Sequence, residues 1–209
     1  MRLYLVRHGQ TDWNKERRIQ GRADINLNEF GRHLARETGK GLADISFAAC
    51  ISSPLTRAVE TARLILGEKD VPVETDTRIM EMDFAEWEGK CCAKERWELP
   101  ERFQDFFDAP DKYVPASGGE SFVDMKKRTG EFLKDIYGRE AYRDKNILIV
   151  THGAALAGIL NNIKEKPLSE YWGVGVHKNC AVTEVEVTEG APVIISENKV
   201  YYKDEVKPW

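Results

Sequence analysis

The stretch Leu-Tyr-Leu-Val-Arg-His-Gly at residues 3–9 has a counterpart in Ile-Leu-Ile-Val-Thr-His-Gly at residues 147–153. In each stretch a continuous apolar run ends in a histidine followed by a glycine. Such a run, followed by turn residues, is typical of a strand that is buried on both faces of a parallel sheet. We therefore expect His8 and His152 just beyond the carboxyl ends of two strands, at the edge of an open α/β sheet where ligands bind.

Helix and strand signals alternate along the rest of the chain. Asn28 precedes an amphipathic helical pattern, and Ser53 with Pro54 predicts the N-cap and first residue of a second helix that runs to about residue 66. Further strands are predicted at 47–52, 71–74, 147–150, 181–187 and 192–196, the last two as an antiparallel hairpin. This rhythm predicts a three-layer α/β/α fold with a mostly parallel sheet of about six strands.

We expect one domain over residues 1–209, with an inserted lid at about residues 88–119. This segment is charged and rich in aromatic residues, and three prolines interrupt it. Its composition is too aromatic for a disordered linker, so we expect a helical lid. Residues 120–136 follow with a helical stripe of Phe122, Met125, Thr129, Phe132, Leu133 and Ile136.

Composition narrows the possible partners. The 31 basic and 35 acidic residues give a net charge of −4 and are spread along the chain, which argues against a nucleic-acid or membrane-surface protein. Residues 1–2 lead directly into the first strand without an apolar leader, so we expect a cytoplasmic protein. The four cysteines lack metal-type spacing, and we expect free thiols, with Cys50 and Cys180 in the core.

Polar residues follow each predicted parallel strand. Arg7 and His8 follow the first, Arg57 the second, Glu81 the third and His152 the fourth. The carboxyl ends of parallel strands share one edge, so these five side chains should surround a common point. Arginine matches phosphate oxygens with two parallel hydrogen bonds, and the helix after Ser53 should add its positive end. The sequence thus predicts a site for phosphoryl chemistry.

The motifs around these residues extend over nearly the whole chain. In order, they are Arg7-His8-Gly9-Gln10-Thr11, Trp13-Asn14, Gln20-Gly21, Leu27 and Gly31, Ser52 to Ala58 with Thr61-Ala62, Glu81 before Phe84 and Trp87-Glu88-Gly89, Gly119-Glu120-Ser121 with Arg128, and Thr151-His152-Gly153. Each is weak by itself, but together they closely resemble the histidine phosphatase superfamily, also called phosphoglycerate mutase-like.

The resemblance implies a role for each site residue. His8 would be the nucleophile that forms a phosphohistidine, with its other ring nitrogen held by a main-chain carbonyl. Glu81 would be the general acid and base. Arg7, Arg57 and His152 would bind the transferring oxygens, and the phosphate-binding set would also include Asn14, Gln20, Gly21 and Gly153. No cofactor and no metal are implied.

At 209 residues the chain resembles the compact phosphatase branch of the superfamily, which includes α-ribazole phosphatases and broad-specificity phosphatases. Ala85 departs from the glycine that is usual there. We therefore expect a metal-independent phosphomonoesterase acting on a small phosphorylated metabolite, such as α-ribazole phosphate or a sugar phosphate. A phosphoglycerate mutase-type phosphotransferase and a non-catalytic phospho-ligand binding module are the alternatives. Both a monomer and a homodimer are compatible with the sequence.

Overall fold

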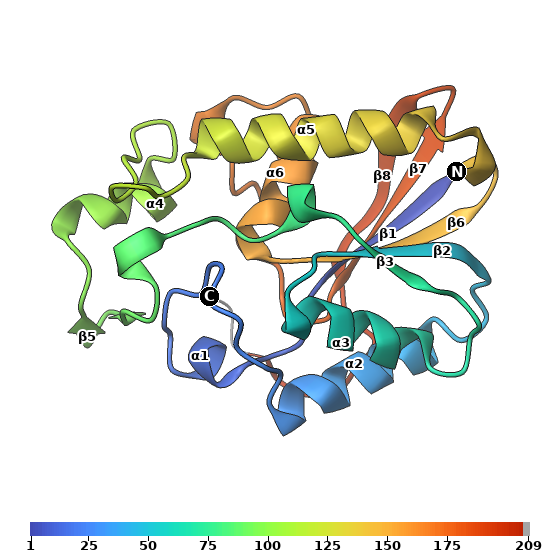
Figure 1. Cartoon of the computed structure of the whole chain (residues 1–209), viewed down its shortest axis with the longest axis horizontal. Coiled ribbons are helices and arrows are strands. Elements are labelled where there is room, and N and C mark those ends of the chain that lie inside the picture. The colour runs from blue at the N-terminus through green and yellow to red at the C-terminus, as the bar shows by residue number, and fades with distance from the viewer. Residues whose placement is uncertain (207–209) are drawn as a thin grey trace.

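The computed structural model, which describes residues 1–206, is built on a six-stranded sheet in the order β3-β2-β6-β1-β7-β8 (Figure 1). The strands are β1 (Arg2–Arg7), β2 (Phe47–Ser52), β3 (Val73–Thr75), β6 (Asn146–Thr151), β7 (Val182–Thr188) and β8 (Ala191–Lys199). The first four are mutually parallel, whereas β7 runs antiparallel to β1 and pairs with β8 as a hairpin. The prediction of about six mostly parallel strands is confirmed.

Helices cover both faces of the sheet. Helices α2 (Glu29–Gly41) and α3 (Thr56–Leu66) lie on one face, and α5 (Phe122–Gly138) and α6 (Gly153–Ile163) lie on the other (Figure 1). Along β1, Tyr4 and Val6 pack toward the first pair, while Leu3 and Leu5 pack toward the second. Because successive strand residues face opposite sides, burial on both sides requires the continuous apolar runs seen in the sequence.

The register of the parallel strands positions the site. Arg7 lies opposite Thr151 in the pairing of β1 with β6, and Ser52 lies opposite Val150 in the pairing of β2 with β6. The three strands therefore end at the same level, and the residues that follow them meet at one edge. The backbone amide of His8 continues the ladder by donating to the carbonyl oxygen of Thr151 at 2.9 Å.

The predicted start of the second helix, at Pro54, is wrong. Helix α3 begins at Thr56 rather than at Pro54, and its N-cap residue, Leu55, offers no side-chain hydrogen bond. Instead, the carboxylate of Asp24 accepts hydrogen bonds from the amide and the hydroxyl of Thr56, at 2.8 and 2.6 Å. A carboxylate from a distant loop thus replaces the local cap, which a local pattern could not predict. Strand β3 also begins two residues later than predicted.

The segment 88–119 is helical only in part. It contains a two-stranded hairpin of β4 (Cys92–Ala93) and β5 (Arg96–Trp97), then η3 (Glu101–Gln104) and α4 (Asp105–Asp108). Its aromatic side chains, including Phe103 and Phe106, pack against Phe122 at the start of α5 and form a third apolar cluster. Figure 1 shows the segment projecting beyond the end of the sheet.

Helix α5 agrees with its prediction. Ser121 is the N-cap, with a capping box to Asp124, and all six residues of the predicted stripe are buried. The remaining short elements are α1 (Asp12–Lys15), η1 (Thr77–Ile79), η2 (Ala85–Trp87), η4 (Glu140–Tyr142) and η5 (Leu168–Glu170). All four cysteines are free, and Cys50 and Cys180 are buried in the core as predicted. Within residues 1–206, no helix has the length and apolar character needed to cross a membrane.

Ala85 adopts a backbone conformation that favours glycine, with φ of +47°. The left-handed region costs a residue with a Cβ roughly 1–2 kcal/mol, which exceeds the roughly 0.4–1 kcal/mol of extra unfolded-chain entropy that glycine brings. We therefore expect Ala85→Gly to raise the free energy of unfolding by up to about 1 kcal/mol in urea denaturation. Ala141→Gly, at an exposed position without a positive φ, is the control and should lower it. Equal destabilisation by both changes would contradict the strain.

Candidate active site

His8 follows β1 directly and is 3% exposed. Its Nδ1 lies 2.7 Å from the carbonyl oxygen of Gly9. Because a carbonyl can only accept, Nδ1 carries the ring proton and Nε2 keeps its lone pair. Burial, together with the charges of Arg57 and Arg7, holds the pKa of His8 well below its ordinary value. His8 is therefore a neutral imidazole at neutral pH, and its main-chain partner is of the kind expected above.

His152 follows β6, and its ring centroid is 5.1 Å from that of His8. Its Nδ1 accepts a hydrogen bond from Nε of Arg57 at 3.2 Å, so its proton must lie on Nε2, which is 2.7 Å from Oγ of Ser53. Burial and the charge of Arg57 hold the pKa of His152 well below its ordinary value. The Ser53 hydroxyl, expected to cap a helix, instead orients this histidine.

Two arginines are buried beside the histidines. Arg57 is fully buried in the first turn of α3, as predicted, and donates to the carbonyl oxygens of Gly21 at 2.6 Å and Ala23 at 2.8 Å. Arg7, at the end of β1, donates to the carbonyl oxygen of His177 at 2.7 Å. Burial lowers the pKa of each arginine to about 10, so both remain charged at neutral pH. Their shared charge makes this edge of the sheet strongly attractive to an anion.

Glu81 provides a buried carboxyl group at the same edge. Its two oxygens accept hydrogen bonds from the backbone amides of Met82 at 2.9 Å and of Ala154 and Ala155 at 3.1 Å each. The last two amides belong to the first turn of α6. Burial raises the pKa of Glu81 above its ordinary value, although these amides and the charge of Arg57 oppose the shift. The net direction favours a carboxyl group that keeps its proton to higher pH than an ordinary glutamate.

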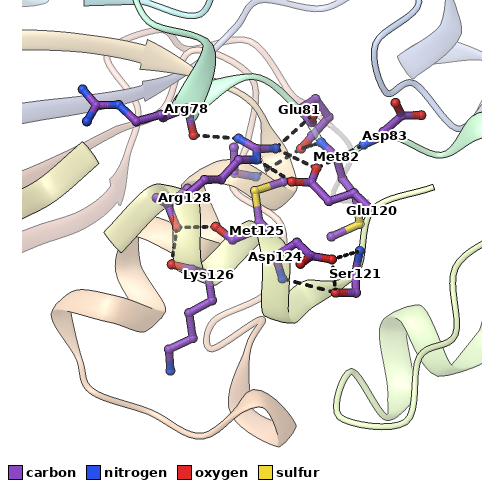
Figure 2. Close-up of polar contacts among 12 residues, drawn as sticks. Arg78, Glu81, Met82, Asp83, Glu120, Ser121, Asp124, Met125, Lys126 and Arg128 are labelled. Carbon is purple, nitrogen blue, oxygen red and sulfur yellow. Dashed lines mark hydrogen bonds and ion pairs between the residues drawn. The ribbon is translucent and has the colours of Figure 1, made fainter. Parts of the chain in front are cut away.

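Arg128 of α5 holds the chain on both sides of Glu81. It donates to the carbonyl oxygens of Arg78 at 2.6 Å and Glu81 at 3.2 Å, and it is paired with the carboxylate of Glu120 at 2.5 Å (Figure 2). Glu120 in turn accepts a hydrogen bond from the amide of Asp83. This network ties the segment carrying Glu81 to the start of α5, so the carboxyl group is held by main-chain contacts on either side.

A chain of side-chain amides ends at the site. Nδ2 of Asn179 donates to the carbonyl oxygen of His8 at 2.9 Å and to Oδ1 of Asn14 at 3.3 Å. Nδ2 of Asn14 donates to Oε1 of Gln20 at 3.2 Å, and Thr11 also donates to that oxygen. Because the His8 carbonyl can only accept, it sets the direction of the whole chain. The chain ends on Nε2 of Gln20, which is buried and has no hydrogen-bond partner among the described residues.

These groups surround a cavity of about 40 Å³. Of the predicted site residues, the structure places Arg7, His8, Asn14, Gln20, Glu81 and Gly153 on its lining. Arg57, His152 and Gly21 are not on this lining but adjoin it: the ring of His152 lies next to that of His8, Arg57 donates to His152, and the carbonyl oxygen of Gly21 accepts from Arg57. A Cβ on Gly153 would lie 3.2 Å from Cγ1 of Val176, a tight contact, whereas Oε2 of Glu81 and Nε of Arg7 would be at the ordinary contact distances of 3.6 and 3.8 Å.

Three residues at this edge lie outside the predicted site. The sequence predicts Ser53 as a helix cap, and its patterns assign no site role to Asn179 or Trp172. Because β7 is antiparallel to β1, its amino end lies at the same edge, and Asn179 stands just before it. The sequence predicts the β7–β8 hairpin, but it does not show that β7 pairs with β1. Without that pairing, Asn179 could not be placed at the site. Within residues 1–206, no three histidine, cysteine or acidic side chains are grouped to hold a metal ion.

The sheet edge therefore combines a neutral histidine with an outward lone pair, buried cations and a carboxyl group that can exchange a proton. This combination defines an enzyme that handles phosphoryl groups. The family model described as histidine phosphatase superfamily (branch 1) matches residues 3–200, so the chain belongs to that superfamily.

Individual relatives agree with this assignment. Bacillus stearothermophilus YhfR has a solved structure that is similar with a TM-score of 0.88 and 37% identity, over 95% of this chain and 97% of that one. A putative phosphoserine phosphatase 2 of Hydrogenobacter thermophilus is 33% identical over 95% of this chain and 96% of the relative. The adenosylcobalamin/alpha-ribazole phosphatase of Escherichia coli is 29% identical over 86% and 87%. The class of activity is phosphoric monoester hydrolysis.

Asn179→Asp tests the amide chain. The change keeps the side-chain shape but places an oxygen against both the His8 carbonyl oxygen and Oδ1 of Asn14. The amide orientations of Asn14 and Gln20, which depend on these hydrogen bonds, should then no longer be fixed. Two buried polar contacts at about 1–3 kcal/mol each predict that inhibition by inorganic phosphate weakens roughly tenfold or more. Asn162→Asp is the matched control, because the partners of that amide among the described residues belong to α5 and α6. It should lower the melting temperature and leave phosphate inhibition unchanged, whereas wild-type inhibition of Asn179→Asp would refute the chain.

Proposed function

We propose that the protein hydrolyses a small phosphorylated metabolite through a phosphohistidine on His8. The observation that carries the proposal is the hydrogen bond from Nδ1 of His8 to the Gly9 carbonyl oxygen, which directs the lone pair of Nε2 away from the main chain. A neutral imidazole in that tautomer can attack phosphorus without first losing a proton. Arg7, Arg57 and His152 then bind the phosphoryl oxygens, with Asn14 and Gln20 as neutral donors.

In the first half-reaction Nε2 of His8 forms a bond to phosphorus while the ester P–O bond breaks, and Glu81 gives its proton to the departing alcohol oxygen. In the second, a water molecule attacks the phosphohistidine and gives a proton to Glu81 as the P–N bond breaks. Inorganic phosphate leaves, and both residues return to their starting states. The raised pKa of Glu81 supports its role as the acid in the first step.

The nucleophile is tested with His8→Ala. Hydrolysis of p-nitrophenyl phosphate in the presence of chelator should fall by roughly a thousandfold or more, because the variant lacks the proposed nucleophile. Acid-quenched wild type should carry a phosphate on His8 in mass spectrometry. His33→Ala is the control, because His33 is exposed and pairs with Asp204 on the surface.

The outcomes of this experiment distinguish three functions. Chelator-resistant turnover that His8→Ala abolishes and His33→Ala retains supports the phosphatase mechanism. A trapped phosphohistidine without net hydrolysis, but with bisphosphate-primed isomerisation of 3-phosphoglycerate, would favour a mutase-type transfer. Tight phosphate binding without any trapped intermediate would instead indicate a binding module.

The role of Glu81 predicts the pH dependence. The folded protein has a raised pKa for this group, and the first step needs it protonated, so kcat for an alkyl phosphate should fall as pH rises through that pKa. Glu81→Gln cannot give up a proton and should lower kcat roughly 100-fold or more, with a flat profile over the same range. Glu86→Gln, at an exposed position nearby, should behave like wild type. A profile that is flat in both wild type and Glu81→Gln would remove Glu81 from the mechanism.

A further inference from the structure

The cavity next to His8 has two chemically different ends. Its polar end is formed by the phosphate-handling residues described above. The remaining wall is mainly apolar and is formed by Ile19, Phe84, Phe106, Phe107, Trp172 and Val176. We refer to these six residues as the apolar wall. Because the apolar wall lines the same cavity as Arg7, His8 and Glu81, the alcohol part of a phosphate ester bound at the polar end lies next to it.

The aromatic part of the wall is fixed in place by a contact between distant segments. Trp172 lies after η5, and its indole Nε1 donates to the carbonyl oxygen of Phe106 in α4 at 2.6 Å. The ring of Trp172 is 5.1 Å from that of Phe106, at an angle of 67°, and 6.3 Å from that of Phe107, at 27°. Flat apolar surfaces held in this way suit an aromatic or aliphatic group better than a hydrated one.

The wall offers no partner for a second anion. Among the described residues that line the cavity, the charged ones are Arg7 and Glu81, and the proposed mechanism uses both. Two arginines lie nearby on the Glu81 side, but Arg128 is paired with Glu120, and Arg22 lies 3.6 Å from Asp83 and 3.8 Å from Glu120. A carboxylate on the substrate would lose water at the apolar wall without gaining a cation.

We propose, on the basis of the phosphatase function above, that this enzyme prefers phosphomonoesters of uncharged alcohols whose apolar or aromatic part packs on Phe106, Phe107 and Trp172. Phosphomonoesters whose alcohol part carries a carboxylate are poor substrates. The relative that is 33% identical is named a putative phosphoserine phosphatase, so its name indicates a substrate with a carboxylate. The specificity proposed here differs from that.

Four phosphates of primary alcohols test the preference, because similar leaving groups make their intrinsic reactivity comparable. They are benzyl phosphate, propyl phosphate, phosphoserine and 3-phosphoglycerate. We expect kcat/KM for benzyl phosphate to exceed that for propyl phosphate roughly tenfold, and that for the two carboxylates roughly 100-fold or more. A kcat/KM for phosphoserine or 3-phosphoglycerate equal to or above that for benzyl phosphate would overturn the inference.

Binding separates this inference from the phosphatase proposal. Benzylphosphonate and 2-amino-3-phosphonopropanoate cannot be hydrolysed, and calorimetry measures their affinities whether or not the enzyme turns over any ester. Tighter binding of benzylphosphonate supports the apolar wall, and the reverse order overturns it. Absence of turnover on all four esters would count against the phosphatase proposal alone.

Two variants of one wall residue should reduce the preference for benzyl phosphate, each relative to a different competing ester. Phe107 is half-buried, so its replacement should be tolerated. Phe107→Ala should reduce the advantage of benzyl over propyl phosphate to within about threefold, and Phe107→Arg should raise phosphoserine relative to benzyl phosphate at least about tenfold. Phe30→Ala removes a half-buried ring of α2 that does not line the cavity, and it should retain the wild-type ratios. Unchanged ratios in both Phe107 variants would overturn the inference.

Discussion

Burial of two guanidinium charges at one edge of the sheet is the constraint that organises the rest of the molecule. Burial lowers the pKa of Arg7 and of Arg57 to about 10, but neither arginine loses its charge at neutral pH. Main-chain carbonyl dipoles compensate part of that charge, from His177 for Arg7 and from Gly21 and Ala23 for Arg57. The loops after β1 and before β7 must therefore follow paths that bring these carbonyls inward. Carbonyls compensate only partly, so the edge attracts a dianion more strongly than a site built from ion pairs would.

The same charges sort the protonation states of the other groups. Positive potential and burial act together on His8 and His152, and both lower the pKa, so the imidazoles remain neutral. On Glu81 the two effects oppose each other, and burial is the larger, so its pKa rises. A phosphate dianion would cancel part of the positive potential and raise the pKa of Glu81 further. Substrate binding would therefore favour the protonated acid at the moment when the first half-reaction needs it.

The sequence predicts the parts of this arrangement that depend on local periodicity or on the ends of parallel strands. Strand β2 and the buried face of α5 agree with their predictions, and the predicted site residues lie together at one edge. What it could not predict are contacts made across the chain. Asp24 supplies the amino end of α3, which shifts the helix start and frees Ser53 to hold His152. The segment 88–119 is shaped by packing of its rings on α5 rather than by helix propensity, so its hairpin was missed.

The apolar wall also bears on whether the phosphoryl group goes to water or to a second alcohol. A transferase must hold the acceptor while excluding water from the phosphohistidine, and for a charged acceptor this requires polar anchors beyond the phosphoryl site. In this cavity the charged lining residues are Arg7 and Glu81, and both act on the phosphoryl group in the proposed mechanism. Among the residues that the structure describes, an alcohol held mainly by packing on Phe107 and Trp172 has no charged anchor on the cavity lining to retain it after the ester bond breaks. Its departure opens the space next to Glu81 to water, so the composition of the wall favours hydrolysis over transfer.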